Sequence, residues 1–353
     1  MKLTKVRIVG SGLIGTSIGL GLAAKGVSVE MVDIDPRSQA LAQDLVGPSK
    51  EGNSELVILA APISALSSLL DTEFALNASS SFIDISSVKT NPKLYVSSSN
   101  LPLNRFLPSH PMAGREVGGA ESARADLFQG RPWIVDSRGV DSDVLAQGRE
   151  LITLLGGHEI EMAAEEHDQA VALVSHLPQL ISSLMAKQLQ DGEEKWLELA
   201  GAGLRDTVRI AGSDPLLWKE IIAANSESLK TLLEKVKGDL DQLIESLDDP
   251  ASVEKFIAAG NAGRNRIPGK HGGVARKYTY LPVVIEDKPG QLSALFDECA
   301  HAKVNVEDLS IEHSPEQLTG LITLALSQGD ADVLEEHLRK KGWSVHAPRG
   351  ART

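Results

Sequence analysis

The sequence predicts an α/β fold in three parts: an N-terminal Rossmann-type doubly wound sheet, an all-α helical second domain, and a C-terminal βαββαβ ferredoxin-like module. Strand and helix patterns alternate from residue 5 to about residue 162, which is typical of a mostly parallel sheet covered by helices. Only helical periodicity follows, up to about residue 264. We therefore expect domains at residues 1–163, 164–265 and 277–350, with a Gly- and Lys-containing linker at residues 266–276.

The first domain opens with a strand at residues 5–9, a helix at 14–25 and a strand at 28–32. Further apolar runs predict strands at residues 56–60, 81–85, 133–135 and 159–162. Residues 46–53 are polar, at the place where a doubly wound fold usually has its third strand. We therefore expect that strand to be missing or reduced to a stub.

The longest periodic segment of the chain lies in the helical domain. Its apolar residues recur at spacings of three and four: Leu229, Leu232, Leu233, Val236, Leu240, Leu243, Ile244 and Leu247. They form one stripe of a long helix, which needs another helix or a second subunit to cover it, so a homodimer is expected. In the C-terminal module we expect strands at residues 278–285, 305–312, 320–327 and 343–346, and helices at 291–302 and 331–341.

Composition excludes several classes of protein. The net charge of −13 disfavours long contacts with nucleic acid or an anionic membrane surface. The chain has one cysteine, so neither an internal disulfide nor a thiolate zinc cluster is expected, and no metal site is predicted. No apolar run approaches the roughly 18 residues of a membrane span, so the cytoplasm is the expected location.

A glycine-rich string, Gly10-Ser11-Gly12-Leu13-Ile14-Gly15, follows the first strand and opens the first helix. Such a string alone is a weak signal, but Asp33 ends the next strand, where a ribose-binding acid is expected. Its carboxylate would accept bonds from a ribose 2′-OH and repel a 2′-phosphate, which favours NAD over NADP. The residues expected to bind NAD are Gly10, Gly12, Leu13, Ile14, Gly15, Asp33, Ala61 and Pro62.

Five residues with reactive or charged side chains lie in short strings further along the chain. Singly, each also has an ordinary structural interpretation: His110 as a loop histidine, His176 as a core histidine, Arg209 as a surface ion pair, Ser87 as a helix cap and Lys89 as a solvated charge. Composition and periodicity do not decide between these interpretations and a catalytic one.

Taken together and in order, these strings resemble the motifs of prephenate dehydrogenases. They are the glycine string, Ser87-Val88-Lys89, His110-Pro111-Met112-Ala113-Gly114, Ser175-His176-Leu177-Pro178, and Arg209-Ile210-Ala211 with Ser213-Asp214-Pro215. The resemblance covers residues 5 to about 250. It implies NAD-dependent oxidative decarboxylation of prephenate to 4-hydroxyphenylpyruvate in tyrosine biosynthesis. Many relatives have a second histidine where this chain has Gln179.

The resemblance also implies roles for individual residues. His110 would accept or polarise the hydrogen of the substrate's C4 hydroxyl, with Ser87 as its hydrogen-bonding neighbour and His176 in support. Arg209 would hold a substrate carboxylate, and Glu116 would gate the pocket. Asn225 lies where a residue could distinguish prephenate from arogenate, and its neutral amide favours prephenate.

Other functions remain open. An arogenate dehydrogenase would give tyrosine directly. A 3-hydroxyacid or homoserine dehydrogenase would share the dinucleotide domain, but the ordered histidine and arginine motifs argue against both. A non-catalytic sensor of NAD and amino acids belongs to a different class, since a fold alone does not establish chemistry.

The C-terminal module resembles ACT domains, which commonly bind amino acids at paired domain interfaces. The resemblance rests on Asp287-Lys288-Pro289-Gly290-Gln291-Leu292 and Val304-Asn305-Val306. It implies tyrosine as a feedback effector, with ligand residues Asp287, Pro289, Gly290, Gln291, Leu292 and Asn305. The turn at Pro289-Gly290 precedes a helix whose free N–H groups could receive a carboxylate.

Overall fold

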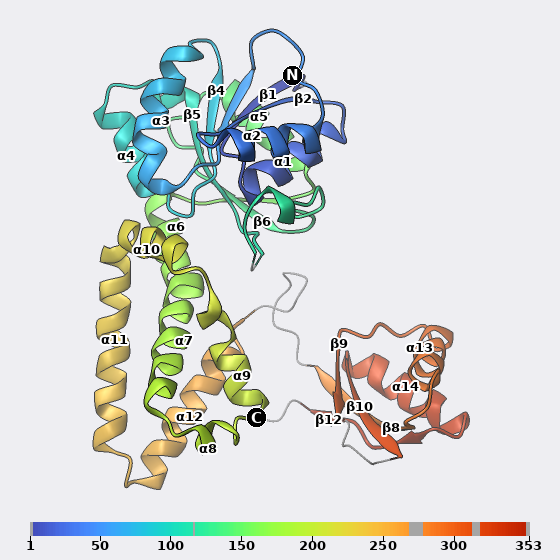
Figure 1. Ribbon diagram of the computed structural model, residues 1–353. Helices are drawn as coiled ribbons and strands as arrows, with labels where there is room; N and C mark the ends of the chain where they lie inside the picture. Colours follow the sequence, from blue (N-terminus) through green and yellow to red (C-terminus); the bar gives the residue numbers. More distant parts are fainter. Residues whose placement is uncertain (1–2, 116, 268–277, 313–317, 351–353) are drawn as a thin grey trace. The chain divides into compact units, whose positions relative to one another are not determined.

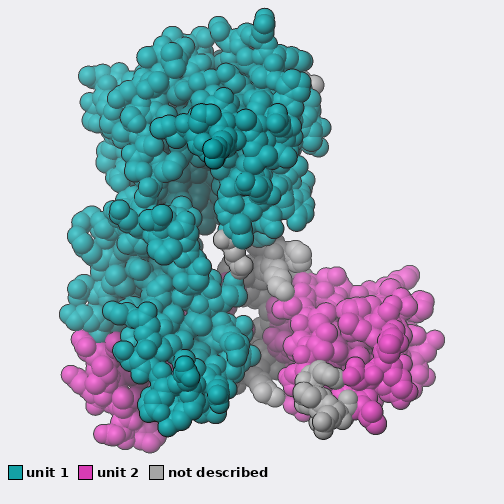
Figure 2. Space-filling model, in the orientation of Figure 1, with its two compact units in different colours: residues 1–238 teal, residues 239–353 magenta. Residues whose placement is uncertain are grey.

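A computed structural model describes residues 3–115, 117–267, 278–312 and 318–350 of the chain. The chain forms two compact units, residues 1–238 and 239–353 (Figure 2). The division falls inside a helix and differs from the domain borders expected from the sequence. No helix in the described ranges is both long and apolar enough to pass through a bilayer.

The first unit begins with a seven-stranded sheet in the order β2-β1-β3-β4-β5-β6-β7 (Figure 1). All neighbouring strands run parallel except β5 and β6, which are antiparallel. The predicted mostly parallel sheet is therefore confirmed. The strands are β1 (Lys5–Val9), β2 (Ser28–Val32), β3 (Leu56–Leu59), β4 (Ser81–Asp84), β5 (Phe106–Pro111), β6 (Pro132–Val135) and β7 (His158–Glu161).

Strand β2 forms one edge of this sheet, because the third strand of a doubly wound fold is absent. Residues 47–55, all described, contain no strand and lead from α2 (Pro36–Val46) directly into β3. The chain leaves α2 through Gly47, whose φ of +90° a glycine adopts without strain. The prediction of a missing strand is confirmed.

Helices cover both faces of the sheet. On one face α1 (Leu13–Ala23), α2 and α5 (Ser142–Leu154) share an apolar cluster with Ile8 and Ile58. On the other face α3 (Ile63–Leu76) and α4 (Thr90–Ser98) pack with Val57 and Leu59. Because neighbouring residues of β3 face opposite layers, both sides of the strand must be apolar, which explains its uninterrupted Leu-Val-Ile-Leu sequence.

The sequence patterns did not predict strand β5, which carries His110. Pro108 and Pro111 lie within it, and proline removes a ladder donor, so the segment lacks an ordinary strand pattern. It forms nonetheless because its first half pairs with β4 and its second half with β6. The interpretation of His110 as a loop histidine is therefore wrong.

A helical region follows the sheet, as the sequence predicts. Its α-helices are α6 (Ala164–Val171), α7 (Leu177–Gln188), α8 (Glu194–Leu197), α9 (Ala202–Val208), α10 (Pro215–Ala224), α11 (Ser226–Glu245) and α12 (Pro250–Arg264). Between α6 and α7 lies a π-helical turn, η3 (Ala172–His176), and short 3-10 turns form η4 (Leu189–Asp191) and η5 (Arg209–Gly212). The predicted stripe lies on α11, except for Leu247, which lies beyond its end.

The second unit includes a sheet in the order β11-β8-β10-β9, with β12 (Arg349–Gly350) also paired to β8. Its elements are β8 (Thr279–Glu286), α13 (Gln291–His301), β9 (Asp308–Glu312), β10 (Thr319–Leu326), α14 (Gln328–Lys340) and β11 (Ser344–Val345). They follow in the predicted order of strand, helix, strand, strand, helix, strand. Leu281, Leu324, Leu295 and Leu334 lie in its core between the sheet and the two helices.

Candidate active site

The turn between β1 and α1 can only be made by glycine at two positions. Gly10 has a φ of +112°, and a Cβ there would lie 2.4 Å from the carbonyl oxygen of Ala60. A Cβ on Gly15 would lie 2.0 Å from the carbonyl oxygen of Gly10. The backbone of the turn therefore lies directly against the end of β3, and Leu13 and Ile14 begin α1 after it.

Gly12 has a different role, because a Cβ there would meet no atom within 4 Å. It is the N-cap of α1, and no side chain caps this end of the helix. Beside it the hydroxyl of Ser11 is buried and makes no hydrogen bond to the described part of the chain. Open space, free N–H groups and an orphaned hydroxyl fit a bound pyrophosphate.

Asp33 lies at the end of β2, next to this turn. Its carboxylate accepts hydrogen bonds from the backbone N–H groups of Ser11 at 2.6 Å and Asp35 at 2.9 Å. These bonds hold the carboxylate beside the glycine turn, where a ribose would lie. Pro62 is the N-cap of α3, and Ala61 precedes it on the loop that leaves β3. The residues present therefore fit NAD.

His110 lies at the end of a chain of hydrogen bonds that was not predicted. Its Nδ1 is 2.9 Å from Nε2 of His167, and Nδ1 of His167 is 2.8 Å from Oδ1 of Asp168. His167 is fully buried on α6. The available sequence signal was an adjacent His-Asp pair, nine residues before His176, at the start of the helical region.

Both predicted histidines are neutral in this environment. Burial is the largest cause that lowers the pKa of His110 well below 6.5, followed by the positive charge that His167, Lys89 and His176 can carry. Burial likewise lowers the pKa of His176 to about 4, against the opposing effect of Asp168. At neutral pH each imidazole has one N–H donor and one lone pair.

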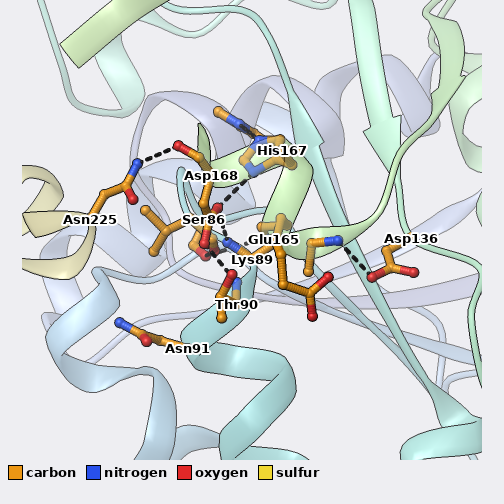
Figure 3. A network of polar contacts seen from close by, with 12 residues as sticks. Ser86, Lys89, Thr90, Asn91, Asp136, Glu165, His167, Asp168 and Asn225 are labelled. Carbon is orange, nitrogen blue, oxygen red and sulfur yellow. Dashed lines mark hydrogen bonds and ion pairs between the residues drawn. The ribbon is translucent and has the colours of Figure 1, made fainter. Parts of the chain in front are cut away.

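Asp168, on α6, links the sheet region of the first unit to its helical region (Figure 3). Its carboxylate accepts the backbone N–H groups of Lys89 at 2.8 Å and Thr90 at 2.9 Å, which lie at the N-terminal end of α4. Its carbonyl oxygen accepts Nδ2–H of Asn225 at 2.7 Å, and the same Nδ2 is 3.2 Å from Nδ1 of His176. One residue of α6 therefore contacts the groups that hold both histidines.

Lys89 is fully buried, so its interpretation as a solvated charge is wrong. Its ammonium group donates to the carboxylate of Asp84 and to the carbonyl oxygen of Ser109, the latter at 2.6 Å. Burial lowers the pKa of this ammonium group, and Asp84 opposes the shift. Asp84 of β4 and Ser109 of β5 supply the oxygen atoms that a buried cation needs. The sequence around Lys89 does not show that these two residues come together in the fold.

Asp136, at the end of β6, fixes the start of α6. It accepts the backbone N–H of Ala164 and the side chains of Lys93 and Arg138, at 2.7–2.8 Å. These donors hold the pKa of the Asp136 carboxyl well below its usual range, although burial opposes them. Because α6 carries His167 and Asp168, this anchor also positions them.

Of the other predicted site residues, Asn225 belongs to this network. Ser87 is half-buried, and the partner of His110 is His167 instead. Arg209 is exposed on η5, which packs against α7. Directly after η5, the hydroxyl of Ser213 donates to Oε1 of Gln179 on α7 at 3.3 Å. Asn225 is buried, with its amide bonded to Asp168. Glu116 lies outside the described residues.

In the second unit, five of the predicted ligand residues lie at the start of α13, whereas Asn305 lies beyond the last residue of that helix, near the other end of the sheet. Gly290 is the N-cap in the left-handed conformation, with φ of +90°, and Gln291 and Leu292 begin the helix after Pro289. Asp287 is held by its backbone N–H to Leu318, and the amide of Asn305 donates to Glu307 at 2.9 Å.

Comparison with known proteins identifies two family models in this chain. Residues 13–161 match the nucleotide-binding domain of prephenate dehydrogenase, and residues 163–258 match its dimerization domain. A probable prephenate dehydrogenase of Streptomyces niveus is 29% identical, over 96% of this chain and 99% of its own length. A cyclohexadienyl dehydrogenase of Zymomonas mobilis is 30% identical, over 71% of this chain and 92% of its own.

Solved structures show the same fold. A prephenate dehydrogenase of Aquifex aeolicus, in complex with hydroxyphenyl propionate and NAD+, has a TM-score of 0.68 and 24% identity, over 76% of this chain and 99% of that one. An arogenate dehydrogenase of Synechocystis has a TM-score of 0.64 and 26% identity, over 74% of this chain and 99% of that one. With its glycine turn, its Asp33 and both matching domains, the chain belongs to the prephenate dehydrogenase family of NAD-dependent oxidoreductases.

Proposed function

We propose that this enzyme converts prephenate to 4-hydroxyphenylpyruvate, with His110 as the group that takes the hydroxyl proton. The observation that carries the proposal is the hydrogen-bond chain from His110 through His167 to Asp168, which ends in a buried carboxylate. A neutral imidazole backed by a carboxylate is a competent proton acceptor.

NAD, when bound, accepts the hydride from C4 of the substrate. Prephenate then loses its ring carboxylate as CO2, and the electron pair of the broken C–C bond completes the aromatic ring. The hydroxyl hydrogen moves toward His110 as C4 gains carbonyl character and returns to the oxygen as the phenol forms. No net proton is consumed, so His110 begins and ends neutral, as its lowered pKa favours.

The remaining polar residues bind and orient the substrate in this proposal. Arg209 would hold a carboxylate of the substrate, for which its planar guanidinium is well suited. His176 would donate a hydrogen bond, since its imidazole is neutral and held by Asn225. Glu116 is proposed as the gate, and Ser87, in the middle of the loop between β4 and α4, as a neighbour of the reacting hydroxyl.

The test is a steady-state assay of NADH formation with prephenate. We expect turnover by the wild type and a loss of about 100-fold or more in His110→Asn. His158→Asn is the matched control, because His158 is exposed on β7, and it should keep wild-type activity. Equal activity of both variants would remove His110 from the mechanism.

Arogenate is the second candidate substrate, since one structural neighbour is an arogenate dehydrogenase and one relative is named for cyclohexadienyl compounds. Its amino group would benefit from a carboxylate partner, whereas Asn225 offers a neutral amide. We therefore propose prephenate as the preferred substrate. Parallel assays with both substrates and with NAD and NADP measure the preference, and a higher kcat/KM for arogenate would reverse it.

We also propose that the β8–β12 module is an ACT domain that binds tyrosine as a feedback effector. Its element order and the left-handed turn at the start of α13 support the proposal. The relative from Streptomyces niveus covers 96% of this chain, so it too spans this region. Calorimetric titration of the full chain with tyrosine should show binding that Asn305→Ala weakens, and the assay should show inhibition. Absence of heat and of inhibition would reject it.

A homodimer is the proposed assembly. The matched model of residues 163–258 describes a dimerization domain. On α11, Leu229 is buried, whereas Leu240 and Ile244 are 51% and 59% exposed and would be covered by a second copy. Sedimentation analysis should give twice the chain mass, and Leu240→Asp should shift it toward the monomer. A wild-type monomer at all concentrations would reject the proposal.

A further inference from the structure

The chain of hydrogen bonds at His110 determines which nitrogen carries the proton. The carboxylate of Asp168 accepts only, so Nδ1 of His167 is the donor at 2.8 Å. In a neutral His167 the other nitrogen, Nε2, then accepts, and Nδ1–H of His110 donates to it across 2.9 Å. The free nitrogen of His110 is consequently Nε2, with a lone pair.

The same reasoning gives the opposite answer for His176. The carbonyl oxygen of Asp168 accepts only, so the side-chain atom of Asn225 that lies 2.7 Å away must be Nδ2. That amino group lies 3.2 Å from Nδ1 of His176 and can only donate to it. The proton of the neutral His176 is therefore on Nε2, and its ring makes a T-shaped contact with that of Trp218, with 6.1 Å between the centroids.

The hydrogen bonds around Asp168 do not require a cation at His167. The carboxylate of Asp168 already receives two backbone N–H groups as well as the imidazole N–H. The carboxylate therefore accepts three hydrogen bonds, and none of them needs a positively charged donor. His167 is fully buried, and a buried charge costs far more than a buried neutral group that is hydrogen-bonded.

We propose that Asp168 is a positioning residue that fixes the two histidines in opposite tautomers, so that His110 accepts through Nε2 and His176 donates through Nε2–H. The proposal rests on the proposed function and deepens it. It adds a division of labour: one imidazole accepts the hydroxyl hydrogen of the substrate, and the other donates to a carboxylate or carbonyl oxygen. A substrate that has a hydroxyl and a carboxylate or carbonyl oxygen can form a hydrogen bond with each histidine. With the tautomers exchanged, His110 would have no lone pair for the hydroxyl hydrogen, and His176 would have no N–H for the oxygen.

Nitrogen NMR of the full chain, with 15N in its histidines and NAD present, reads the tautomers directly. Long-range proton–nitrogen spectra distinguish protonated from unprotonated ring nitrogens, and His110→Asn and His176→Asn assign the two signals by loss. We expect a protonated Nδ1 in His110 and a protonated Nε2 in His176. A protonated Nε2 in His110, with both nitrogens of His167 protonated, would overturn the proposal.

Two variants test the role of Asp168 and its neighbour. Asp168→Asn should convert the His110 signal to a mixture of tautomers and lower kcat by about 100-fold or more, with KM much less changed. His167→Gln should give the same change at His110 but leave the His176 signal as in the wild type, which a general loss of structure would not do. His158→Gln is the matched control and should change neither. Unaltered tautomers in both variants would overturn the proposal.

These measurements separate the inference from the proposed function. Tautomers as expected without turnover of prephenate or arogenate would reject the function alone. Turnover of prephenate with the opposite tautomers would reject the inference alone, because the NMR signals do not depend on activity.

Discussion

The ammonium of Lys89 donates to the carbonyl oxygen of Ser109 at 2.6 Å, directly before His110 in strand β5. The same ammonium contacts the Asp84 carboxylate at the end of β4. The buried Lys89–Asp84 pair therefore joins the end of β4 to β5 directly before His110. The positive charge of Lys89 is also one of the causes that lower the pKa of His110, after burial and His167.

Removal of this ammonium should destabilise the fold. In Lys89→Met the Asp84 carboxylate stays buried without its partner, which typically costs about 3–5 kcal/mol. Urea unfolding should show this loss, and the second substitution in Lys89→Met/Asp84→Asn should recover part of it. Lys25→Met, at an exposed lysine, is the control. Unfolding free energies equal to the wild type would mean that the pair is not needed for stability.

Acid should destabilise the protein through His176. The pKa of His176 is lowered to about 4 in the folded chain, against about 6.5 when unfolded. The unfolded state therefore takes up the proton first. The contribution of His176 to the unfolding free energy is complete above about pH 6.5. It is lost progressively as the pH falls to about 4, and it amounts to roughly 3 kcal/mol in total.

The comparison of wild type with His176→Asn isolates this contribution, because the carboxylates titrate in both. Urea unfolding at about pH 7 and about pH 4 should show a drop that is smaller in the variant by roughly 3 kcal/mol. Parallel losses in the two proteins would show that His176 titrates normally in the folded state.

Arg209→Ala should chiefly raise KM for the substrate. A guanidinium that holds a carboxylate in both ground and transition state contributes about 1.5–3 kcal/mol, so KM should rise about 10- to 100-fold with kcat little changed. Arg205→Ala, one turn earlier and also exposed, should behave as the wild type. A fall in kcat without a change in KM would contradict the anchoring role.

Gly12→Ala should weaken NAD binding without harming the fold. The new methyl group would meet no protein atom within 4 Å, so the melting temperature should stay unchanged. It would occupy space that a pyrophosphate needs, and we expect Kd for NAD to rise about tenfold or more. Gly238→Ala, which also meets no atom within 4 Å, is the control. Unaltered NAD affinity would place the pyrophosphate elsewhere.

Much of the fold could be predicted because it follows from local pattern. Continuous apolar runs identified six strands of the first sheet, and the periodic leucines located α11. Strand β5 escaped prediction because its prolines contradict strand propensity, and two neighbouring strands supply the pairing that overrides it. The π-helical turn that ends at His176 likewise has no local signature.

By itself the sequence determined the glycine turn, the acid at the end of β2, the order of the three regions and the resemblance that identified the family. These depend on residues close together in the chain, where spacing and side-chain chemistry are sufficient. The tertiary structure alone decided that Lys89 is buried and that Asp168 reaches His110 through His167 and His176 through Asn225. His167 is 57 residues from His110, and Asn225 is 57 residues from Asp168. The pKa of a buried group depends on what folding brings beside it and on the water that folding excludes.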